Sequence, residues 1–76
     1  MKYVLITGAY GGMGLKTTQK LASEGFTIFA LDKQVGPAEE NVVPIQTDVT
    51  DVESIKKAFN KIKTFTNELF AIIHFA

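Results

Sequence analysis

The amino-acid sequence predicts an α/β fold in which a parallel sheet of about four strands packs against two main helices. Two patterns predict it. Short, nearly continuous apolar runs, typical of buried strands, recur along the chain, and two of the segments that separate these runs carry apolar residues at helical spacing. The third observation is composition, because 46% hydrophobic and 21% charged residues in a chain of 76 are normal for one small folded domain. A chain this short buries only roughly 60% of its unfolded surface, which is too little for separate cofactor and substrate domains.

The first part of the chain predicts a strand, a helix and a second strand. Residues 3–6 (Tyr-Val-Leu-Ile) form an apolar run that is typical of a strand buried on both faces. Residues 13–24 predict a helix that ends at Gly25, a residue suited to a helix C-terminus. The expected apolar stripe of this helix consists of Met13, Thr17, Thr18, Leu21 and Ala22. Residues 26–31 predict the second buried strand, which ends on Asp32.

A loop and a third strand are expected next. Residues 33–41 are rich in turn-forming and charged residues and predict a loop, with one helical turn opening at Pro37. Residues 41–46 predict the third strand. Because Pro44 cannot donate a hydrogen bond to a neighbouring strand, this strand is expected at an edge of the sheet.

The last part of the chain predicts the second helix and a fourth strand. Residues 50–53 (Thr-Asp-Val-Glu) have the form of a capping box, which begins this helix. Its expected apolar stripe consists of Val52, Ile55, Phe59, Ile62 and Phe65. Residues 69–76 predict a fourth buried strand. With right-handed crossovers between parallel strands, these elements make half of a doubly wound sheet with strands in the order 3-2-1-4.

The most informative stretch is the glycine-rich segment 7–14 (Thr-Gly-Ala-Tyr-Gly-Gly-Met-Gly), which joins the first strand to the first helix. A Rossmann dinucleotide-binding turn needs glycine where the chain reverses, where the backbone approaches the pyrophosphate and where helix meets strand. The N–H groups and the positive dipole end of the helix then bind the pyrophosphate without a basic side chain. Gly8, Gly12 and Gly14 are the expected contacts, while Gly11 leaves the motif's register open. The residues expected at the cofactor here are Gly8, Tyr10, Gly11, Gly12, Met13 and Gly14.

Two other interpretations of this turn fit less well. A P-loop for nucleoside triphosphates requires a glycine directly before Lys16 and another earlier in the loop, where Leu15 and Tyr10 stand. A turn without any ligand would carry four glycines in seven positions, which weakens a fold unless close approach of a ligand offsets the cost.

Asp32 predicts the cofactor preference. It follows Gly14 at close to the roughly 20-residue spacing of the acid that binds the adenosine ribose hydroxyls. A 2′-phosphate would meet like charge there, so Asp32 favours NAD(H) over NADP(H). The neighbouring Lys33 is the counterargument, since an ammonium group tolerates a phosphate.

Residues 7–14 resemble the Thr-Gly-x-x-x-Gly-x-Gly cofactor loop of short-chain dehydrogenases/reductases, and Thr7 is specific to that family among dinucleotide-binding folds. Residues 48–51 (Asp-Val-Thr-Asp) also resemble the segment that follows the family's third strand. The resemblance implies that Asp48 and Val49 lie at the adenine.

The fourth strand resembles the family only in part. The family usually has Asn-Asn-Ala-Gly here, lining the cofactor, whereas this chain keeps Ala76 but has His74 and Phe75 in place of the asparagines. The resemblance implies that Phe75 and Ala76 lie at the cofactor, and His74 is expected to line it or to pack. These substitutions are closer to the extended branch of the family, whereas residues 48–51 favour the classical branch, so the branch is left open.

The resemblance implies an enzyme that exchanges a hydride between nicotinamide and a carbonyl or alcohol substrate. The catalytic serine and Tyr-x-x-x-Lys pair of this family follow the fourth strand, so the resemblance implies that they lie beyond it. Neither Tyr3 nor Tyr10 is the family's catalytic tyrosine, because neither is followed by lysine four positions on. We therefore expect residues 1–76 to be a dinucleotide-binding segment truncated before the catalytic half, with the substrate bound only by a full-length parent. The alternatives are a non-catalytic Rossmann regulator that senses dinucleotides and a half-domain without a cofactor.

Composition narrows the partners. Eight basic and eight acidic side chains give zero net charge, which argues against nucleic acid, and no apolar segment approaches the length of a membrane span. Without cysteine there is no thiolate metal site, no metal is expected, and the expected compartment is the cytoplasm. A fourth strand without a neighbour would leave an apolar sheet edge, so self-association through that edge is expected.

Overall fold

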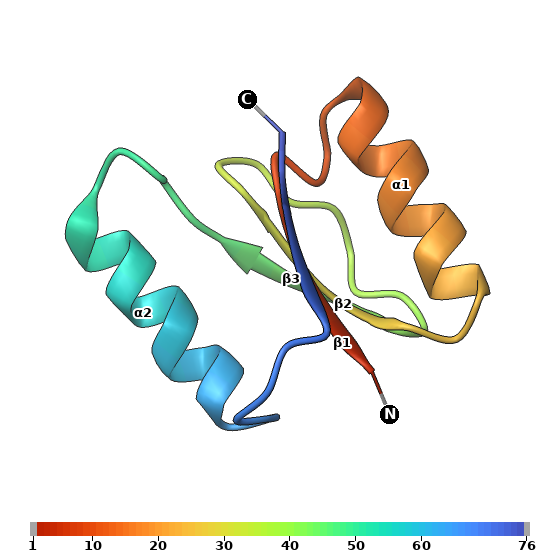
Figure 1. Cartoon of the computed structure of the whole chain (residues 1–76). Coiled ribbons are helices and arrows are strands. Elements are labelled where there is room, and N and C mark those ends of the chain that lie inside the picture. Colours follow the sequence, from red (N-terminus) through yellow and green to blue (C-terminus); the bar gives the residue numbers. More distant parts are fainter. Residues whose placement is uncertain (1, 76) are drawn as a thin grey trace.

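A computed structural model describes residues 2–75 and forms, within that range, a four-stranded sheet flanked by two helices. The elements are β1 (Tyr3–Thr7), α1 (Gly12–Ser23), β2 (Thr27–Asp32), β3 (Val42–Gln46), α2 (Val52–Lys63) and β4 (Ala71–His74). All strand pairs are parallel and the order is β3-β2-β1-β4, so the predicted fold class and strand order are confirmed. The two helices lie on opposite faces of the sheet (Figure 1).

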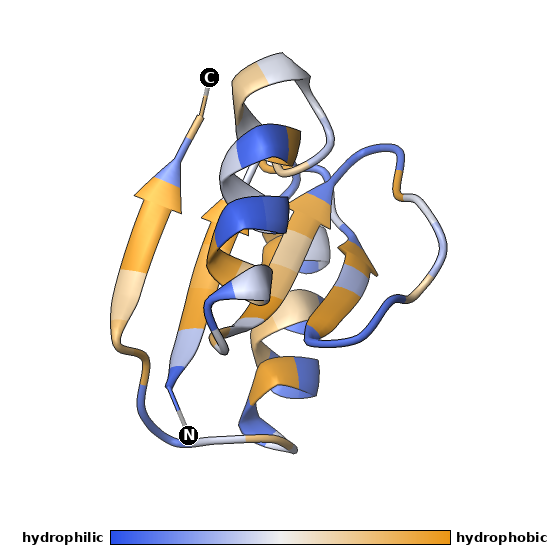
Figure 2. Ribbon diagram, turned by 90° about the vertical axis from the view of Figure 1, so that its right-hand side faces the viewer, coloured by the Kyte–Doolittle hydropathy of each residue, from blue (hydrophilic) through white to orange (hydrophobic). Residues whose placement is uncertain are grey.

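The core is built from the two central strands, β1 and β2. Their apolar side chains alternate between the sheet faces, so Val4 and Ile28 pack on the α1 side while Leu5 and Phe29 pack on the α2 side. All four are almost completely buried. The prediction of two strands buried on both faces is thus confirmed, and the strands stand out as hydrophobic bands in Figure 2.

The edge strands differ from the central ones. β3 lies at an edge, as predicted, with Pro44 opposite Ala30 of β2. The prediction of a buried strand over residues 69–76 is wrong in length and in burial, because β4 has only four residues and Ile72 is 62% exposed. The physical reason is position: among the described residues β4 pairs with β1 alone, and Ile72, although it lies on the α2 side opposite Leu5, is outside the cluster that α2 forms with β1, β2 and β3.

The predicted apolar stripe of helix α1 is confirmed at Thr18, Leu21 and Ala22, which are buried or pack against the core, but not at Met13. Met13 is 73% exposed, whereas Gly14 and Thr18 are buried. At the start of the helix the residue that contacts the β1–α1 turn is Gly14 and not Met13. The predicted end is confirmed: the N–H of Gly25, at φ 94°, donates to Ala22 O and the Phe26 N–H donates to Leu21 O, which together make a Schellman motif.

Helix α2 has a different N-cap from the predicted capping box. Asp51, not Thr50, caps the helix, and its Oδ1 accepts from the Glu53 N–H at 3.0 Å. Thr50 is engaged elsewhere, because its hydroxyl and its N–H both donate to Asp48 Oδ1. Neither α1 nor α2 is long and apolar enough to cross a membrane.

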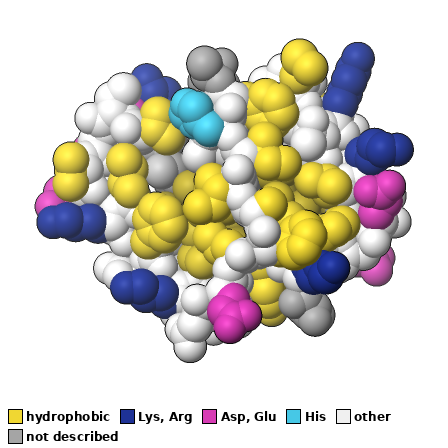
Figure 3. Space-filling model, viewed as in Figure 1, with side chains coloured by type: hydrophobic (Ala, Val, Ile, Leu, Met, Phe, Trp, Pro, Cys, Tyr) yellow, Lys and Arg dark blue, Asp and Glu magenta, His cyan; other side chains and the backbone are white. Residues whose placement is uncertain are grey.

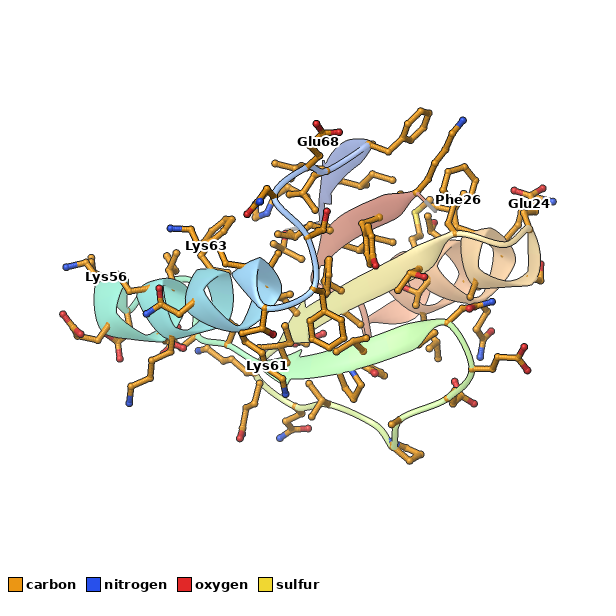
Figure 4. All side chains as sticks on the ribbon, turned by 90° about the horizontal axis from the view of Figure 1, so that it is seen from below. Glu24, Phe26, Lys56, Lys61, Lys63 and Glu68 are labelled. Carbon is orange, nitrogen blue, oxygen red and sulfur yellow. The ribbon has the colours of Figure 1, made fainter. Side chains whose placement is uncertain are left out.

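The apolar stripe of α2 is narrower than predicted. Ala58 and Ile62 are buried, but Val52 and Phe59 are exposed. Only Ala58 and Ile62 of this helix belong to the buried cluster that it forms with β1, β2 and β3, and Val52 and Phe59 remain 64% and 38% exposed. The opposite side carries exposed lysines, and in Figure 4 Lys56 points away from the sheet.

The loop over residues 33–41 is confirmed, but the predicted helical turn at Pro37 is wrong. The chain closes instead through a bridge from Glu39 to Val42, whose N–H donates to Glu39 O at 3.0 Å. Asn41 turns the chain there at φ 65°, and its side-chain amide donates to Ala22 O at 3.3 Å. This contact ties the loop to the end of α1.

Candidate functional site

A cleft of about 180 Å³ lies at the carboxyl ends of the strands, the place where open parallel sheets bind ligands. Its lining comes from the ends of β1, β2 and β4 and from the segment after β3. The lining residues are Thr7, Gly8, Leu31, Asp32, Lys33, Thr47, Val49, His74 and Phe75. The structure thus brings together Gly8, Asp32, Lys33, Val49 and Phe75 from the predicted set, while Ala76 lies outside the described residues.

Gly8 begins the turn at the end of β1. Its φ of 67° belongs to the left-handed region that favours glycine, and a Cβ there would lie 2.6 Å from the Phe75 carbonyl oxygen. The Phe75 N–H donates to Thr7 O at 3.1 Å, so the end of β4 is held directly against this turn. In Figure 1 the β1–α1 turn and the end of β4 lie side by side. Any side chain at residue 8 would force the two apart.

Gly14 sets the distance between the turn and helix α1. A Cβ at this buried position would overlap the Gly8 carbonyl oxygen and lie 2.9 Å from its carbon. Gly14 is therefore the glycine of helix-to-turn packing, a requirement of the dinucleotide-binding turn.

Gly11 and Gly12 have no such packing role. Gly11 is the N-cap of α1 without a side-chain cap, and a Cβ on Gly12 would meet no heavy atom within 4 Å. The first three N–H groups of a helix have no intrahelical acceptor, and no acidic residue stands in the first turn of α1. The open space and the uncompensated helix dipole fit an anionic group such as a pyrophosphate. Met13 is exposed beside them and does not line the cleft.

The Asp32 carboxylate is fixed by two backbone N–H groups. Oδ2 accepts from the Tyr10 N–H at 2.9 Å, and Oδ1 accepts from the Lys33 N–H at 2.7 Å. Each carboxylate oxygen has a further lone pair, so the group can still accept hydrogen bonds from a ligand hydroxyl. The end of β2 and the glycine turn are thereby joined at the cleft.

The Tyr10 side chain points away from the cleft, which the sequence did not predict. Its ring packs on Gly36 and against the core on the α1 side, and its hydroxyl oxygen is buried without a hydrogen-bond partner among the described residues. Burial raises the pKa of Tyr10, and the carboxylates of Glu39 and Asp32 raise it further. The nearby Gly36 N–H opposes this rise, although its geometry does not make a hydrogen bond.

Tyr10→Phe should raise the free energy of unfolding by about 1 kcal/mol at neutral pH, because a buried hydroxyl without a partner carries a desolvation cost. The wild type should also lose stability as the pH rises above the usual tyrosine pKa of about 10, since the unfolded chain ionises first. The variant should lack that part of the loss. Urea unfolding followed by circular dichroism, at neutral and alkaline pH, measures both, and a less stable variant at neutral pH would contradict the structure.

Asp48 lies beside the cleft rather than in it. Its Oδ1 accepts from the Thr50 hydroxyl at 2.6 Å and the Thr50 N–H at 2.9 Å, and its own N–H donates to Ser54 Oγ at 2.8 Å. The hydrogen bonds from Thr50, with a smaller effect of Lys33, lower the pKa of Asp48, so it is a charged acceptor at neutral pH. Asp48 lines a neighbouring hollow at the start of α2, and Lys33 and Thr47 line both this hollow and the cleft.

Three lining residues of the cleft were not predicted from the sequence: Thr7, Leu31 and Thr47. His74, which was expected to line the cofactor or to pack, also lines the cleft. The Thr7 hydroxyl contacts His74 Nδ1, and the two residues are register partners in β1 and β4. The signal that could have identified them is the parallel register itself, which places the last residues of neighbouring strands at one edge. Within residues 2–75 no cluster of metal-ligating side chains is present.

Comparison with known proteins identifies the family. The model of the short chain dehydrogenase family matches residues 2–76. The chain belongs to the short-chain dehydrogenase family. The glycine turn and the strand order described above are therefore those of a family member.

Curated family members of different activity are similar to this chain. Estradiol 17-beta-dehydrogenase 2 of Mus musculus is 38% identical over 96% of this chain and 22% of its own length. NADPH-dependent 1-acyldihydroxyacetone phosphate reductase of Schizosaccharomyces pombe is 34% identical over 87% of this chain and 24% of its own length. The chain thus spans about a quarter of the length of these relatives.

Solved structures of the family superpose closely on the fold. Menthone neomenthol reductase from Mentha piperita is 27% identical, with a TM-score of 0.86 over 99% of this chain and 31% of that one. A short chain dehydrogenase from Leptospira borgpetersenii with bound NAD+ is 26% identical, also with a TM-score of 0.86 over 99% of this chain and 31% of that one.

Proposed function

We propose that this chain binds the adenosine and pyrophosphate of NAD(H) as part of a short-chain oxidoreductase that acts on a carbonyl or alcohol substrate. The observation that carries the proposal is the glycine turn. At Gly14 a side chain would overlap the Gly8 carbonyl oxygen, whereas the first turn of α1, at Gly12, faces open space. Close helix packing beside an open helix N-terminus is the arrangement that a bound pyrophosphate requires.

Each part of the site has a proposed role. The N–H groups at Gly12, Met13 and Gly14 bind the pyrophosphate, and the Asp32 carboxylate accepts from the ribose hydroxyls. Asp48 and Val49 bind the adenine, and Phe75 lines the cofactor beside the end of β4. For Ala76, which is outside the described residues, a cofactor contact is proposed from the family resemblance alone. The bound dinucleotide would supply a hydride acceptor or donor, and the substrate would be bound by the rest of a longer protein.

The preference for NAD(H) rests on Asp32. Its charge faces the cleft that would hold the ribose, and a 2′-phosphate there would be repelled. Lys33 lines the same cleft but is attached to the loop beyond β2. The relatives include both an NADPH-dependent reductase and a structure with bound NAD+, so family membership does not determine the cofactor. We therefore base the preference for NAD(H) on Asp32 and Lys33 themselves.

Calorimetric titration of the chain with NAD+ and NADP+ tests the proposal. We expect saturable binding of NAD+ and weaker binding of NADP+. Lys61→Ala is the matched control, because this exposed side chain on α2 lies outside the cleft and should change neither affinity. Absence of binding by both dinucleotides would refute the proposed function.

We also propose that the chain self-associates through the β4 edge. In Figure 3 hydrophobic side chains gather on both sides of this strand, between the two helices. Ile72 and Phe65, which are 62% and 46% exposed, contribute to the apolar surface on the α2 side. An edge strand presents unpaired N–H and C=O groups, and the zero net charge sets up no overall repulsion between copies.

Size-exclusion chromatography with light scattering should show a dimer or larger species. Ile72→Lys should shift the chain toward the monomer, because it places a charge on the edge. Val52→Lys is the control, since Val52 is equally exposed but stands at the start of α2, away from β4. A wild-type chain that stays monomeric at high concentration would contradict this prediction.

A further inference from the structure

The loop over residues 33–41 follows Asp32 directly. Tyr10, in the glycine turn, contacts both Asp32 and this loop. The backbone N–H of Tyr10 donates to Asp32 Oδ2 at 2.9 Å, while its ring lies against Gly36. One residue therefore contacts the acid at the end of β2 through its main chain and the following loop through its side chain.

The ring fits closely under the loop. A Cβ built on Gly36 would lie 3.1 Å from Tyr10 Cε1, which is tighter than ordinary contact. The hydroxyl oxygen is shielded from solvent, and the ring packs against the core on the α1 side. Because the hydroxyl has no partner among the described residues, the ring holds the loop by packing alone.

We propose that Tyr10 is a positioning residue for cofactor choice, whose ring fixes the 33–36 segment so that Asp32, and not Lys33, faces the ribose. This inference rests on the proposed function. Asp32 and Lys33 are adjacent in sequence and both line the cleft, but they have opposite preferences for a 2′-phosphate. Whether the charge of Asp32 or that of Lys33 determines the cofactor preference depends on the conformation of the backbone after Asp32. The Tyr10 ring packs on this backbone at Gly36 and stabilises its conformation.

Replacing Tyr10 by alanine tests the role of the ring alone, because alanine keeps the backbone N–H that donates to Asp32. Tyr10→Ala should free the 33–36 segment, let the Lys33 ammonium approach the ribose, and lower the ratio of NAD+ to NADP+ affinity by roughly tenfold. Tyr10→Phe should keep the wild-type ratio, because the hydroxyl makes no hydrogen bond within residues 2–75. In the ligand-free chain, hydrogen exchange of the 33–36 amides should rise in Tyr10→Ala and not in Tyr10→Phe.

Calorimetric titration of wild type and variants with both dinucleotides measures the ratio, and Gly36→Ala gives a second test from the other side of the contact. The added methyl group should displace the Tyr10 ring and lower the ratio of NAD+ to NADP+ affinity several-fold. If Tyr10→Ala does not fold, Gly36→Ala provides the test. If Tyr10→Ala or Gly36→Ala folds and loses stability but keeps the wild-type affinity ratio, the proposal is wrong. It is also wrong if Tyr10→Phe lowers the affinity ratio as much as Tyr10→Ala does. A wild type that binds neither dinucleotide would overturn the proposed function together with this inference.

Discussion

Replacing Gly14 by alanine should lower the free energy of unfolding by about 3 kcal/mol or more, the largest effect expected of a single methyl group in this chain. The added Cβ would overlap the Gly8 carbonyl oxygen, which is a main-chain atom that cannot rotate away. Gly8 itself is fixed in the left-handed region and held against Phe75, so the turn has little room to move. Relief requires helix α1 to separate from the sheet, and both stability and dinucleotide binding should be lost together.

Gly12→Ala is the matched control for Gly14→Ala. It adds the same methyl group two residues earlier on the same helix, where a Cβ meets no heavy atom within 4 Å. Stability should stay unchanged or rise by up to about 1 kcal/mol, because alanine favours helix more than glycine does. Urea unfolding of the wild type, Gly14→Ala and Gly12→Ala, followed by circular dichroism, measures the differences in the free energy of unfolding. Equal stability of the two variants would show that the turn and α1 do not meet as closely as described.

Asp32→Ala should weaken NAD+ binding by roughly ten- to a hundredfold, since charge-assisted hydrogen bonds to the ribose hydroxyls are lost. NADP+ binding should fall far less or increase, because the repulsion of the 2′-phosphate disappears and Lys33 remains in the cleft. Calorimetric titration with both dinucleotides gives the two affinities.

Asp51→Ala is the charge-matched control for this experiment. It removes the N-cap of α2 and should cost about 1 kcal/mol of stability, without changing the ratio of the two affinities. If Asp32→Ala keeps the wild-type ratio, Asp32 does not determine the cofactor preference.

The architecture could be predicted because it depends on local patterns. Continuous apolar runs identified β1 and β2, and the glycine turn identified the end of one strand and the start of a helix. Pro44 marked β3 as an edge strand through a property of its own backbone, the missing N–H. Such signals survive without knowledge of neighbouring elements.

The errors fall where burial depends on a neighbour. Val52 and Phe59 follow the helical period of α2 but are 64% and 38% exposed, because neither belongs to the buried cluster between that helix and the sheet. Ile72 has the sequence environment of a core residue and is exposed, because β4 stands at the edge. Periodicity shows which residues share a face, but not whether another element covers it.

The candidate site shows the same division. From residue types and spacing alone, the sequence determined the family resemblance, the glycine turn and the acid at the end of β2. Only the tertiary structure separated Gly14, which is required by contact with Gly8, from Gly12, which faces open space. It also turned the Tyr10 ring under the 33–36 segment and brought His74 to Thr7. The physical reason is that local sequence fixes backbone propensity, whereas these roles depend on distances between segments that meet only when the sheet and its helices pack together.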